Sequence, residues 1–552
     1  SWANLTDIEV ICSHFWVSER MPIASYDPDT RRVVSSRQSI FCLRDSYSPR
    51  WAKYRLENVF AALRQPGQWY HDRKEGRLIY LPRDGESPEH TRVLAPRALQ
   101  LLRVAGEPGA VVQGLCFRGL KFCHTEWLQS DGHGRWWEPG RPAATWKPRD
   151  SYAHNLGGPP PEGRPYATTP QAAFELPGVL HFTHAADCVV EDCTIEHTGF
   201  HGIVAAEGCT RLRFSGNTLR DLGAGGILAD GGAAGSAQER HTSHLAITDN
   251  TIEGNGHVFP GACGIATLHG YRHVIAHNRL SDLTYSGISC GWVWGYDESI
   301  SREIRIEHNH IHGLGRRAGL SDLGGIYLLG VQPGTVVRGN VVHDLAMANY
   351  GAWGIYLDQG ASFVTVEGNV VLRTQSEAYH EHWGRQNLVR GNLFALSRTP
   401  GVVRICPEPW GDEVAYPAPG GLFTGNVLVS EGQPIYVDHE NYLASPQVTF
   451  AANILWDQAR TTELVAWDHA PWPHHTARDP FGGPRTFTLA DLQGRGLERH
   501  STIQDPGIDF QSTPPVYRSP ETLARDLGFR LPDVSQAGPR QAGSVCTGKD
   551  PR

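Results

Sequence analysis

Two aspartates occur in similar sequence surroundings and have the clearest capacity for chemistry. Asp322 shortly precedes the run GGIYLL, and Asp358 ends the run GIYLD. Hydrolysis of a glycosidic bond uses two carboxyl groups, one that protonates the leaving oxygen and one that attacks or activates water. We therefore take Asp322 and Asp358 as the candidate catalytic pair.

Aromatic and imidazole side chains accompany the two aspartates. Side chains alternate across a strand, so an inward Ile326 and Ile355 predict an outward column of Tyr327, Tyr356 and His380. The next outward column holds Leu329, Asp358 and His382, whereas Glu381 points inward. Because aromatic faces stack on sugar rings, we expect substrate contacts from Trp292, Trp294, Tyr327, Tyr356, His380, His382 and Trp383.

Each candidate also has a purely structural interpretation. Asp322 suits a turn before Gly-Gly, Asp358 suits a strand end that accepts from loop amides, and the tryptophans suit packing beneath loops. Superposing the two GIY runs places Asp322 over residue 351, seven residues before Asp358, which is roughly 23 Å in an extended strand. The pair therefore works only if the loop that holds Asp322 folds back.

A repeat indicates the elements that must position these residues. Short β-branched runs surround an Asn that recurs every 23 to 34 residues, and their alternation of apolar and polar residues indicates strands. Each unit fits one coil of a solenoid with three short strands, so we predict an all-β, right-handed parallel β-helix. Asn suits the bend because it tolerates the left-handed conformation, and successive amides could stack as a ladder. The repeated residues are Asn217, Asn250, Asn278, Asn309, Asn340, Asn369, Asn392, Asn426 and Asn453.

Gly-Ile pairs begin another strand of each coil. Six pairs recur, and in three coils the segment before the pair is longer. Because enlarged loops on one side of a rigid scaffold commonly carry function, this side is expected to hold the site. The pairs start at Gly202, Gly226, Gly264, Gly287, Gly325 and Gly354.

The repeat also suggests a division of the chain. Residues 1–110 lack it and read as an α+β segment with a short helix, a Pro-Gly turn and a hairpin that packs on the solenoid. Residues 111–456 form the predicted β-helix, interrupted at 128–170 by a Gly-, Pro- and Trp-rich insertion. Residues 457–552 are expected to close the solenoid, with a short helix near residues 520–527.

Composition excludes several classes of protein. The 552 residues are 40% hydrophobic, with a net charge of −8 and no apolar run long enough to span a membrane, so neither nucleic acid nor a membrane is expected as a partner. The 11 cysteines form no CxxC pair and suit free thiols, and neither a metal nor a cofactor is predicted. Nothing indicates an oligomeric state.

Several motifs resemble one group of known enzymes. SDLGGIYLLGVQPGT, YGAWGIYLDQG and GISCGWVWGYD are similar to right-handed parallel β-helix glycoside hydrolases, closest to family 141 and more distantly to family 120. LENVFAALRQPGQWYHDRKEGRLIYLP resembles the segment before their main coils, and DLGFRLPDVSQAG resembles their closing segment. The resemblance therefore spans almost the whole chain.

The resemblance implies an enzyme that acts on plant cell-wall carbohydrate, either xylan or fucose-containing pectin. It also implies an aspartate pair at the positions of Asp322 and Asp358, and a secreted or periplasmic protein. The chain departs from the pattern at Gln359, where such sequences often have Glu, and if that Glu is the acid in some relatives, its role is missing here.

Two other functions stay open. A polysaccharide lyase on the same fold would need a base, and since no Lys lies between Lys147 and Lys549, only Arg385 or Arg404 offers one. A non-catalytic solenoid that binds glycans would use the tryptophans without the aspartates. Release of reducing sugar without absorbance at 235 nm separates hydrolysis from both.

Overall fold

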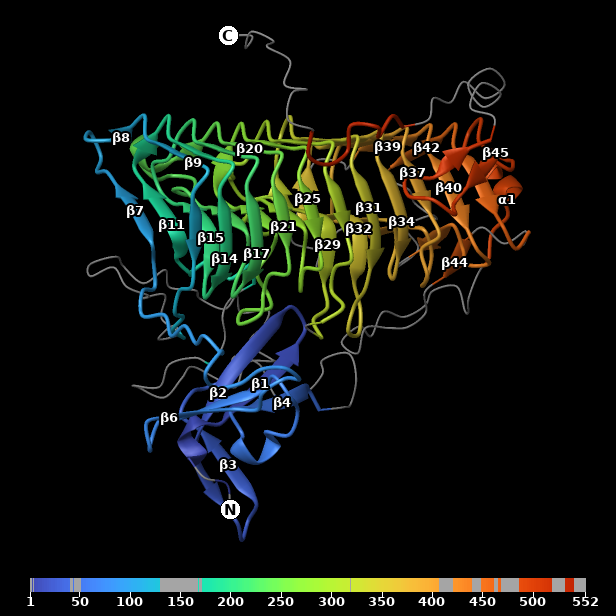
Figure 1. Cartoon of the computed structure of the whole chain (residues 1–552). Coiled ribbons are helices and arrows are strands. Elements are labelled where there is room, and N and C mark those ends of the chain that lie inside the picture. Colours follow the sequence, from blue (N-terminus) through green and yellow to red (C-terminus); the bar gives the residue numbers. More distant parts are fainter. Residues whose placement is uncertain are drawn as a thin grey trace.

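The computed structural model is a long stack of β-coils with a smaller antiparallel sheet beneath it (Figure 1). None of the helices in the described part of the chain is long and apolar enough to cross a membrane. The structure describes residues 2, 4–39, 43, 51–129, 167, 171–317, 319–406, 420–438, 448–460, 465–467, 486–518 and 532–540.

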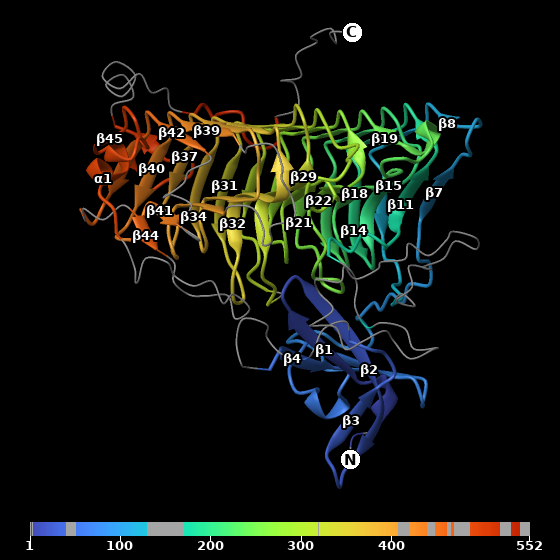
Figure 2. The same ribbon diagram turned by 180° about the vertical axis from the view of Figure 1, so that it is seen from behind.

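The coils stack into three long parallel sheets, two of twelve strands and one of eleven. The first sheet contains β7 (Leu102–Ala105), β11 (Gly178–Thr183), β15 (His201–Ala205), β18 (Ile227–Ala229), β22 (Ile265–Thr267), β26 (Ile288–Cys290), β29 (Leu323–Val331), β32 (Ala352–Ser362), β35 (Tyr379–His382), β38 (Val403–Cys406), β41 (Tyr436–Asp438) and β44 (Val465–Trp467). Figure 2 shows β29 and β32 near the middle of the stack.

The other two sheets complete each coil. The second sheet contains β10 (Lys121–Cys123), β14 (Thr194–Thr198), β17 (Thr218–Leu222), β21 (Thr251–Glu253), β25 (Arg279–Ser281), β28 (His310–His312), β31 (Val341–Leu345), β34 (Val370–Thr374), β37 (Leu393–Ala395), β40 (Val427–Ser430), β43 (Ile454–Asp457) and β45 (Thr502–Ile503). The third contains β9 (Cys116–Arg118), β13 (Val189–Glu191), β16 (Arg213–Ser215), β20 (Ala246–Thr248), β24 (Val274–Ala276), β27 (Arg305–Glu307), β30 (Val336–Arg338), β33 (Thr365–Glu367), β36 (Asn387–Arg390), β39 (Gly421–Thr424) and β42 (Thr449–Ala451). This confirms the predicted parallel β-helix with three strands per coil.

The asparagines form a buried ladder at the bend between the third and second sheets. Oδ1 of Asn309 accepts hydrogen bonds from the backbone N and Nδ2 of Asn278, at 3.0 and 2.9 Å. Asn309 makes the same two bonds to Asn340. The predicted stacking is therefore confirmed, because every rung satisfies a backbone amide that the bend would leave unpaired.

The expectation that Asn itself adopts the left-handed conformation at the bend is wrong. The left-handed conformation belongs to the residue before each Asn, as at His308 (φ 55°) and Gly339 (φ 64°). The Asn itself supplies the stacking amide, and its neighbour makes the turn.

Aliphatic side chains fill the inside of the stack. Ile288, Ile326 and Ile355 lie in register on neighbouring strands of the first sheet and are fully buried. At about 25 cal/mol per Å² of apolar surface, such columns supply most of the stabilisation. Nine cysteines in the described residues are free thiols, and six of them are buried.

The N-terminal segment forms a four-stranded antiparallel sheet in the order β3-β2-β1-β4. Its strands are β1 (Glu9–His14), β2 (Val17–Asp27), β3 (Arg32–Ser35) and β4 (Lys53–Glu57), with the 3₁₀ turn η1 (Leu5–Asp7) before them. The predicted hairpin is present as β5 (Trp69–Asp72) and β6 (Arg77–Tyr80), paired antiparallel. The predicted helix before it is only a 3₁₀ turn, η2 (Phe60–Ala62), followed closely by the predicted Pro-Gly turn.

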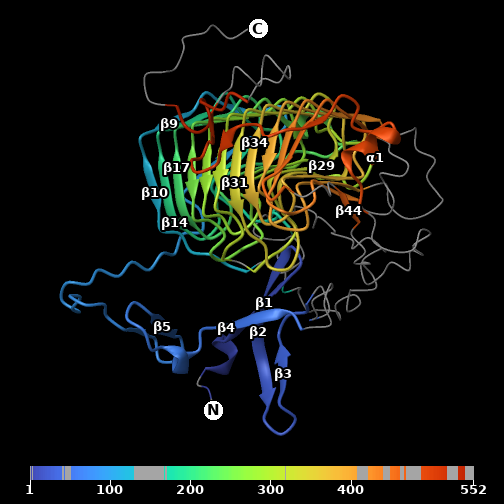
Figure 3. The ribbon, with the colours of Figure 1, turned by 90° about the vertical axis from the view of Figure 1, so that its right-hand side faces the viewer.

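The stack extends beyond residues 111 and 456, because β7 joins it at one end and β44 and β45 at the other. The short helix α1 (Leu489–Gly494) lies at this second end (Figure 3). Short elements outside the main sheets are β8 (Val112–Gln113), β12 (Ala185–Ala186), β19 (Thr242–Ser243), β23 (Gly270–Tyr271), η4 (Gln238–Arg240), β46 (Ile508–Asp509) and β47 (Val516–Tyr517). Most of the predicted insertion 128–170 and the helix predicted near 520–527 lie outside the described residues.

Candidate active site

The predicted outward columns are in register on the first sheet. Tyr327 on β29 is aligned with Tyr356 on β32, and Tyr356 with His380 on β35. Leu329 is aligned with Asp358. Although these side chains face away from the core, Tyr327 is 2% and Tyr356 is 3% exposed, because neighbouring chain segments cover them. The side chains of both columns are therefore largely shielded from solvent.

The Asp358 carboxylate is surrounded by hydrogen-bonding groups. The hydroxyls of Tyr327 and Tyr356 donate to Oδ2 and Oδ1, each at 2.7 Å. Nδ1 of His382 lies 2.9 Å from Oδ1. Burial, and then the charges of the two aspartates, raise the pKa of both phenols above its usual range, so they stay protonated and donate.

Asp322 occupies a sharp turn immediately before β29. Its φ is 63°, its N donates to the Tyr350 carbonyl at 3.1 Å, and its own carbonyl accepts from the Tyr285 hydroxyl at 2.6 Å. The structural interpretation of Asp322 as a turn residue thus holds for its backbone, while the side chain faces the site.

The two carboxyls meet through one hydroxyl. Oδ1 of Asp322 lies 3.4 Å from the Tyr356 hydroxyl, which also contacts Asp358 at 2.7 Å. The nearest oxygens of the two carboxyls are therefore no farther apart than the sum of these distances, about 6 Å. The loop does not fold back along the strand as the pair was expected to require, because Leu323 pairs with Ala352 and the N of Asp322 donates to Tyr350. The two carboxyls approach each other through their side chains and the Tyr356 hydroxyl instead.

The two aspartates differ in their surroundings. Desolvation by the surrounding protein, followed by the negative charge of Asp358, raises the pKa of Asp322 well above its usual range, and the Tyr356 hydrogen bond only partly offsets this. Asp322 keeps some solvent exposure, whereas Asp358 is 4% exposed. Two carboxyls in different surroundings within one site can divide the roles of acid and of base or nucleophile between them.

An aromatic wall continues from Tyr356 along the sheet. Trp353 lies 4.2 Å from the Tyr356 ring and stacks on His380 at 4.6 Å. Its Nε1 donates to Glu377 at 2.7 Å, and the Arg404 Nε donates to the same carboxylate at 2.7 Å. Glu377 is 1% exposed in this ion pair. It therefore holds the Trp353 ring in place rather than contacting substrate.

The predicted tryptophans are arranged in two different ways. Trp383 lies 4.5 Å from the ring of His382, which contacts Asp358. Trp292 packs against Phe174 at 5.7 Å and Trp294 at 5.0 Å and is 9% exposed. Of these two, Trp294 is the more exposed and the better placed to stack on a sugar. Glu381, as expected, points inward, where the Tyr379 hydroxyl donates to it at 2.6 Å.

Sequence reasoning missed Tyr285 and Glu377. Tyr285 follows β25 and lies outside the aligned GIY runs, so its link to Asp322 arises only through the turn. Glu377 stands immediately before the AYHEH strand, and a charged residue at the start of a buried run was the available signal.

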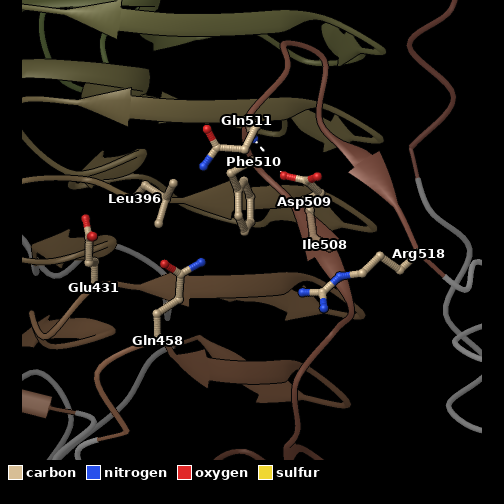
Figure 4. A pocket seen from close by; sticks show the side chains of 8 residues that line it. All are labelled: Leu396, Glu431, Gln458, Ile508, Asp509, Phe510, Gln511 and Arg518. Carbon is tan, nitrogen blue, oxygen red and sulfur yellow. Dashed lines mark hydrogen bonds between the residues drawn. The ribbon is translucent and has the colours of Figure 1, made fainter.

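No group of three or more His, Cys, Asp or Glu side chains in the described part of the chain is arranged to hold a metal ion. A separate hollow of about 430 Å³ lies away from the aspartates, beside β46 (Figure 4). Its lining residues are Leu396, Glu431, Gln458, Ile508, Asp509, Phe510, Gln511 and Arg518.

Comparisons with known proteins support the fold. Residues 177–395 match the family model described as "Right handed beta helix region", which agrees with the predicted hand of the solenoid. A search of curated protein sequences finds no match. None of the matches distinguishes family 141 or family 120.

Several solved structures resemble this chain at low identity. One titled "Glycoside hydrolase" superposes with a TM-score of 0.56 and 21% identity, over 70% of this chain and 67% of that one. An Azotobacter vinelandii mannuronan C-5 epimerase module (9% identity, 53% and 76% covered) and an alginate lyase with a trisaccharide (12% identity, 66% and 84% covered) have TM-scores of 0.36. The first likeness supports the fold alone, and the other two structures are too different to support a conclusion about this chain.

Proposed function

We propose that this chain is a glycoside hydrolase that cleaves plant cell-wall carbohydrate, xylan or fucose-containing pectin, with Asp322 and Asp358 as its catalytic pair. The observation that carries the proposal is the Tyr356 hydroxyl, which contacts both carboxyls at once. The choice of sugar rests on the sequence resemblance, and we also propose a secreted or periplasmic location on that ground.

The surroundings assign a role to each aspartate. Asp322 keeps its proton because burial and the Asp358 charge raise its pKa, so it protonates the leaving glycosidic oxygen. Asp358, held by two phenols and His382, acts on the opposite side of the anomeric carbon. Trp353 and Trp383 offer ring faces for the sugar.

The short separation favours direct attack by Asp358. Retaining glycosidases have carboxyls about 5 to 5.5 Å apart, whereas inverting enzymes need about 6.5 to 9.5 Å to admit water. With the nearest oxygens no more than about 6 Å apart, a covalent glycosyl intermediate on Asp358 fits better. Asp322 then deprotonates the water that releases the sugar, and the anomeric configuration is retained.

The structure gives a lyase little support. Arg404 donates to the buried Glu377 carboxylate, so its guanidinium is already engaged as a hydrogen-bond donor. Arg385 lies over the Tyr296 ring at 3.6 Å, as a cation does. The raised phenol pKa values also make Tyr327 and Tyr356 poor bases.

The test is the product formed from xylan and from fucose-bearing pectic oligosaccharides. We expect new reducing ends without absorbance at 235 nm, and loss of about 10² to 10⁴-fold in kcat for Asp322→Asn and for Asp358→Asn. Asp230→Asn is the matched control, because Asp230 immediately follows β18 of the same sheet and pairs with His269 instead. Absorbance at 235 nm would establish a lyase, and binding without turnover would establish a non-catalytic solenoid.

A further inference from the structure

The hairpin formed by β1 and β2 ends in a two-residue turn that touches the loop of Asp322. The Phe15 carbonyl accepts a hydrogen bond of 2.7 Å from the N of Ser321. Phe15 is 7% exposed, and Trp16 packs against the core of the solenoid. Figures 1 and 3 show the N-terminal sheet beneath the stack, with this hairpin directed at its coils.

The backbone at Asp322 needs support from its surroundings. A non-glycine residue with φ of 63° is in a sparsely populated conformation that costs on the order of 1 to 3 kcal/mol. The hydrogen bonds that hold it come from Tyr350, from Gly351, which accepts from the N of Leu323 at 2.8 Å, and from Tyr285. All of these partners belong to the solenoid.

Ser321 connects the turn to the hairpin. Its Oγ accepts from the backbone N of Asn349 at 3.1 Å and of Tyr350 at 3.3 Å, while its own N donates to Phe15. Phe15 thus supplies, from more than 300 residues away in the sequence, the acceptor next to the strained residue.

The hairpin is itself held firmly in place. His14 and Glu19 face each other across it at 2.7 Å, with both side chains fully buried. Arg20 pairs with Glu9 at 2.7 Å and donates from Nε to the Val258 carbonyl of the solenoid at 3.3 Å. The tip therefore cannot shift freely relative to the coils.

We propose that Phe15 and Trp16 are positioning residues of the active site, which hold the turn at Asp322 so that its carboxyl reaches Tyr356. Trp16 anchors the tip on the solenoid, and the Phe15 carbonyl fixes Ser321. The N-terminal sheet is then part of the catalytic unit rather than an appended module. This inference rests on the proposed function for its kinetic consequences.

The first test is kinetic. Phe15→Gly/Trp16→Gly keeps the carbonyl and a turn that accepts positive φ but removes the anchor, and we expect kcat to fall about 10- to 100-fold with KM changed less than about threefold. The single variant Trp16→Phe, which keeps an aromatic ring at the anchor, should keep most of the wild-type kcat. Thr30→Ala, in the distal turn between β2 and β3 where Thr30 contacts Asp27, should leave kcat unchanged.

A pH profile separates positioning from a general loss of stability. The groups that face Asp322 are Asp358, Tyr356, Tyr327 and Tyr285, whereas His14 and Glu19 of the hairpin face each other. A loosened tip admits water and lowers the pKa of Asp322, so the basic limb of kcat should move to lower pH. A folded glycine variant with unchanged kcat and an unchanged basic limb would overturn the proposal.

A second measurement does not depend on activity. Carbodiimide coupling of an amine to carboxyls, read by mass spectrometry, should modify Asp322 several-fold faster in the glycine variant than in Thr30→Ala. Equal rates in the two would overturn the positioning role. If the glycine variant does not fold, Trp16→Ala takes its place in both measurements under the same criteria. If the wild-type protein cleaves no glycan, the proposed function fails, and labelling alone decides the inference.

Discussion

At the scale of single residues, one phenol hydroxyl connects two carboxyls that would otherwise be unrelated in the chain. Tyr356 donates to Asp358 at 2.7 Å and lies 3.4 Å from Asp322. The same ring stacks on His380 at 5.0 Å and contacts Trp353. Loss of this hydroxyl should therefore change catalysis while the ring stays in place.

We expect Tyr356→Phe to lower kcat about 10- to 100-fold, because a hydrogen bond to a charged group contributes about 1.5 to 3 kcal/mol. Steady-state kinetics on the substrate identified by product analysis would measure it. Tyr271→Phe, in the short strand β23 outside the first sheet, is the control. Unchanged kcat in Tyr356→Phe would mean that Asp358 needs no support from this phenol.

The raised pKa of Asp322 also predicts how stability depends on pH. An unfolded Asp loses its proton near pH 4, whereas the folded chain keeps it to higher pH. Above pH 4 the unfolded state therefore binds fewer protons, and stability falls as pH rises through this window. Asp322→Asn cannot ionise, so it avoids this loss.

The Tm of Asp322→Asn relative to wild type should accordingly increase from pH 4 towards pH 7. Calorimetry across that range would measure the difference, with Tyr271→Phe as a variant that alters no carboxyl. A constant difference would show that the folded chain does not retain this proton.

At the scale of elements, the asparagine ladder determines the register of the coils. Each amide inside the ladder accepts two hydrogen bonds from the rung before it and donates to the rung after it, as Asn309 does with Asn278 and Asn340. Asn309 also donates to the Ile275 carbonyl at 2.9 Å. The ladder positions β29 and β32 indirectly, because each of these strands belongs to the same coil as one of the asparagine bends.

Asn309→Ala should lower the free energy of unfolding by about 1 to 3 kcal/mol, because it leaves the buried backbone N of Asn278 without an acceptor. Urea denaturation would measure this, with the exposed Gln458→Ala as control. A loss no greater than that of the control would mean that water replaces the missing amide.

At the scale of the whole molecule, the ends of the solenoid expose strand edges that invite association. At the C-terminal end, α1 begins with a capping box in which Thr488 and Asp491 bond reciprocally. Its Leu492 is 1% exposed and belongs to the main core. The helix therefore covers the last coil and separates the core from solvent.

Leu492→Ala should cost about 2 to 5 kcal/mol of stability, as buried Leu truncations do, and should promote self-association through the uncovered coil. Denaturation and light scattering would detect the two effects. Leu78→Ala, at a site 48% exposed on the β5–β6 hairpin, is the control. Stability equal to that of the control would show that α1 does not contribute to the core.

Local patterns in the sequence were enough to predict the solenoid. Asn217 to Asn453 mark the bends, and the Gly-Ile pairs mark the strands of the first sheet, because a repeated coil imposes the same environment on the same position each time. The outward columns followed from alternation alone, and Tyr327, Tyr356 and His380 are aligned as predicted. The predicted helix before the β5–β6 hairpin is only a 3₁₀ turn, since residues 58–65 lack enough length before the Pro-Gly turn.

Only the tertiary structure decided how Asp322 meets Asp358. Stacking places the Asp322 backbone beside Gly351, yet its carboxyl reaches the Tyr356 hydroxyl from a left-handed turn. That turn is held by Tyr285, Tyr350 and the hairpin tip at Phe15. These partners come from different coils and from a separate sheet. Periodicity specifies what recurs in every coil, whereas a single turn held by distant segments has no repeat to reveal it.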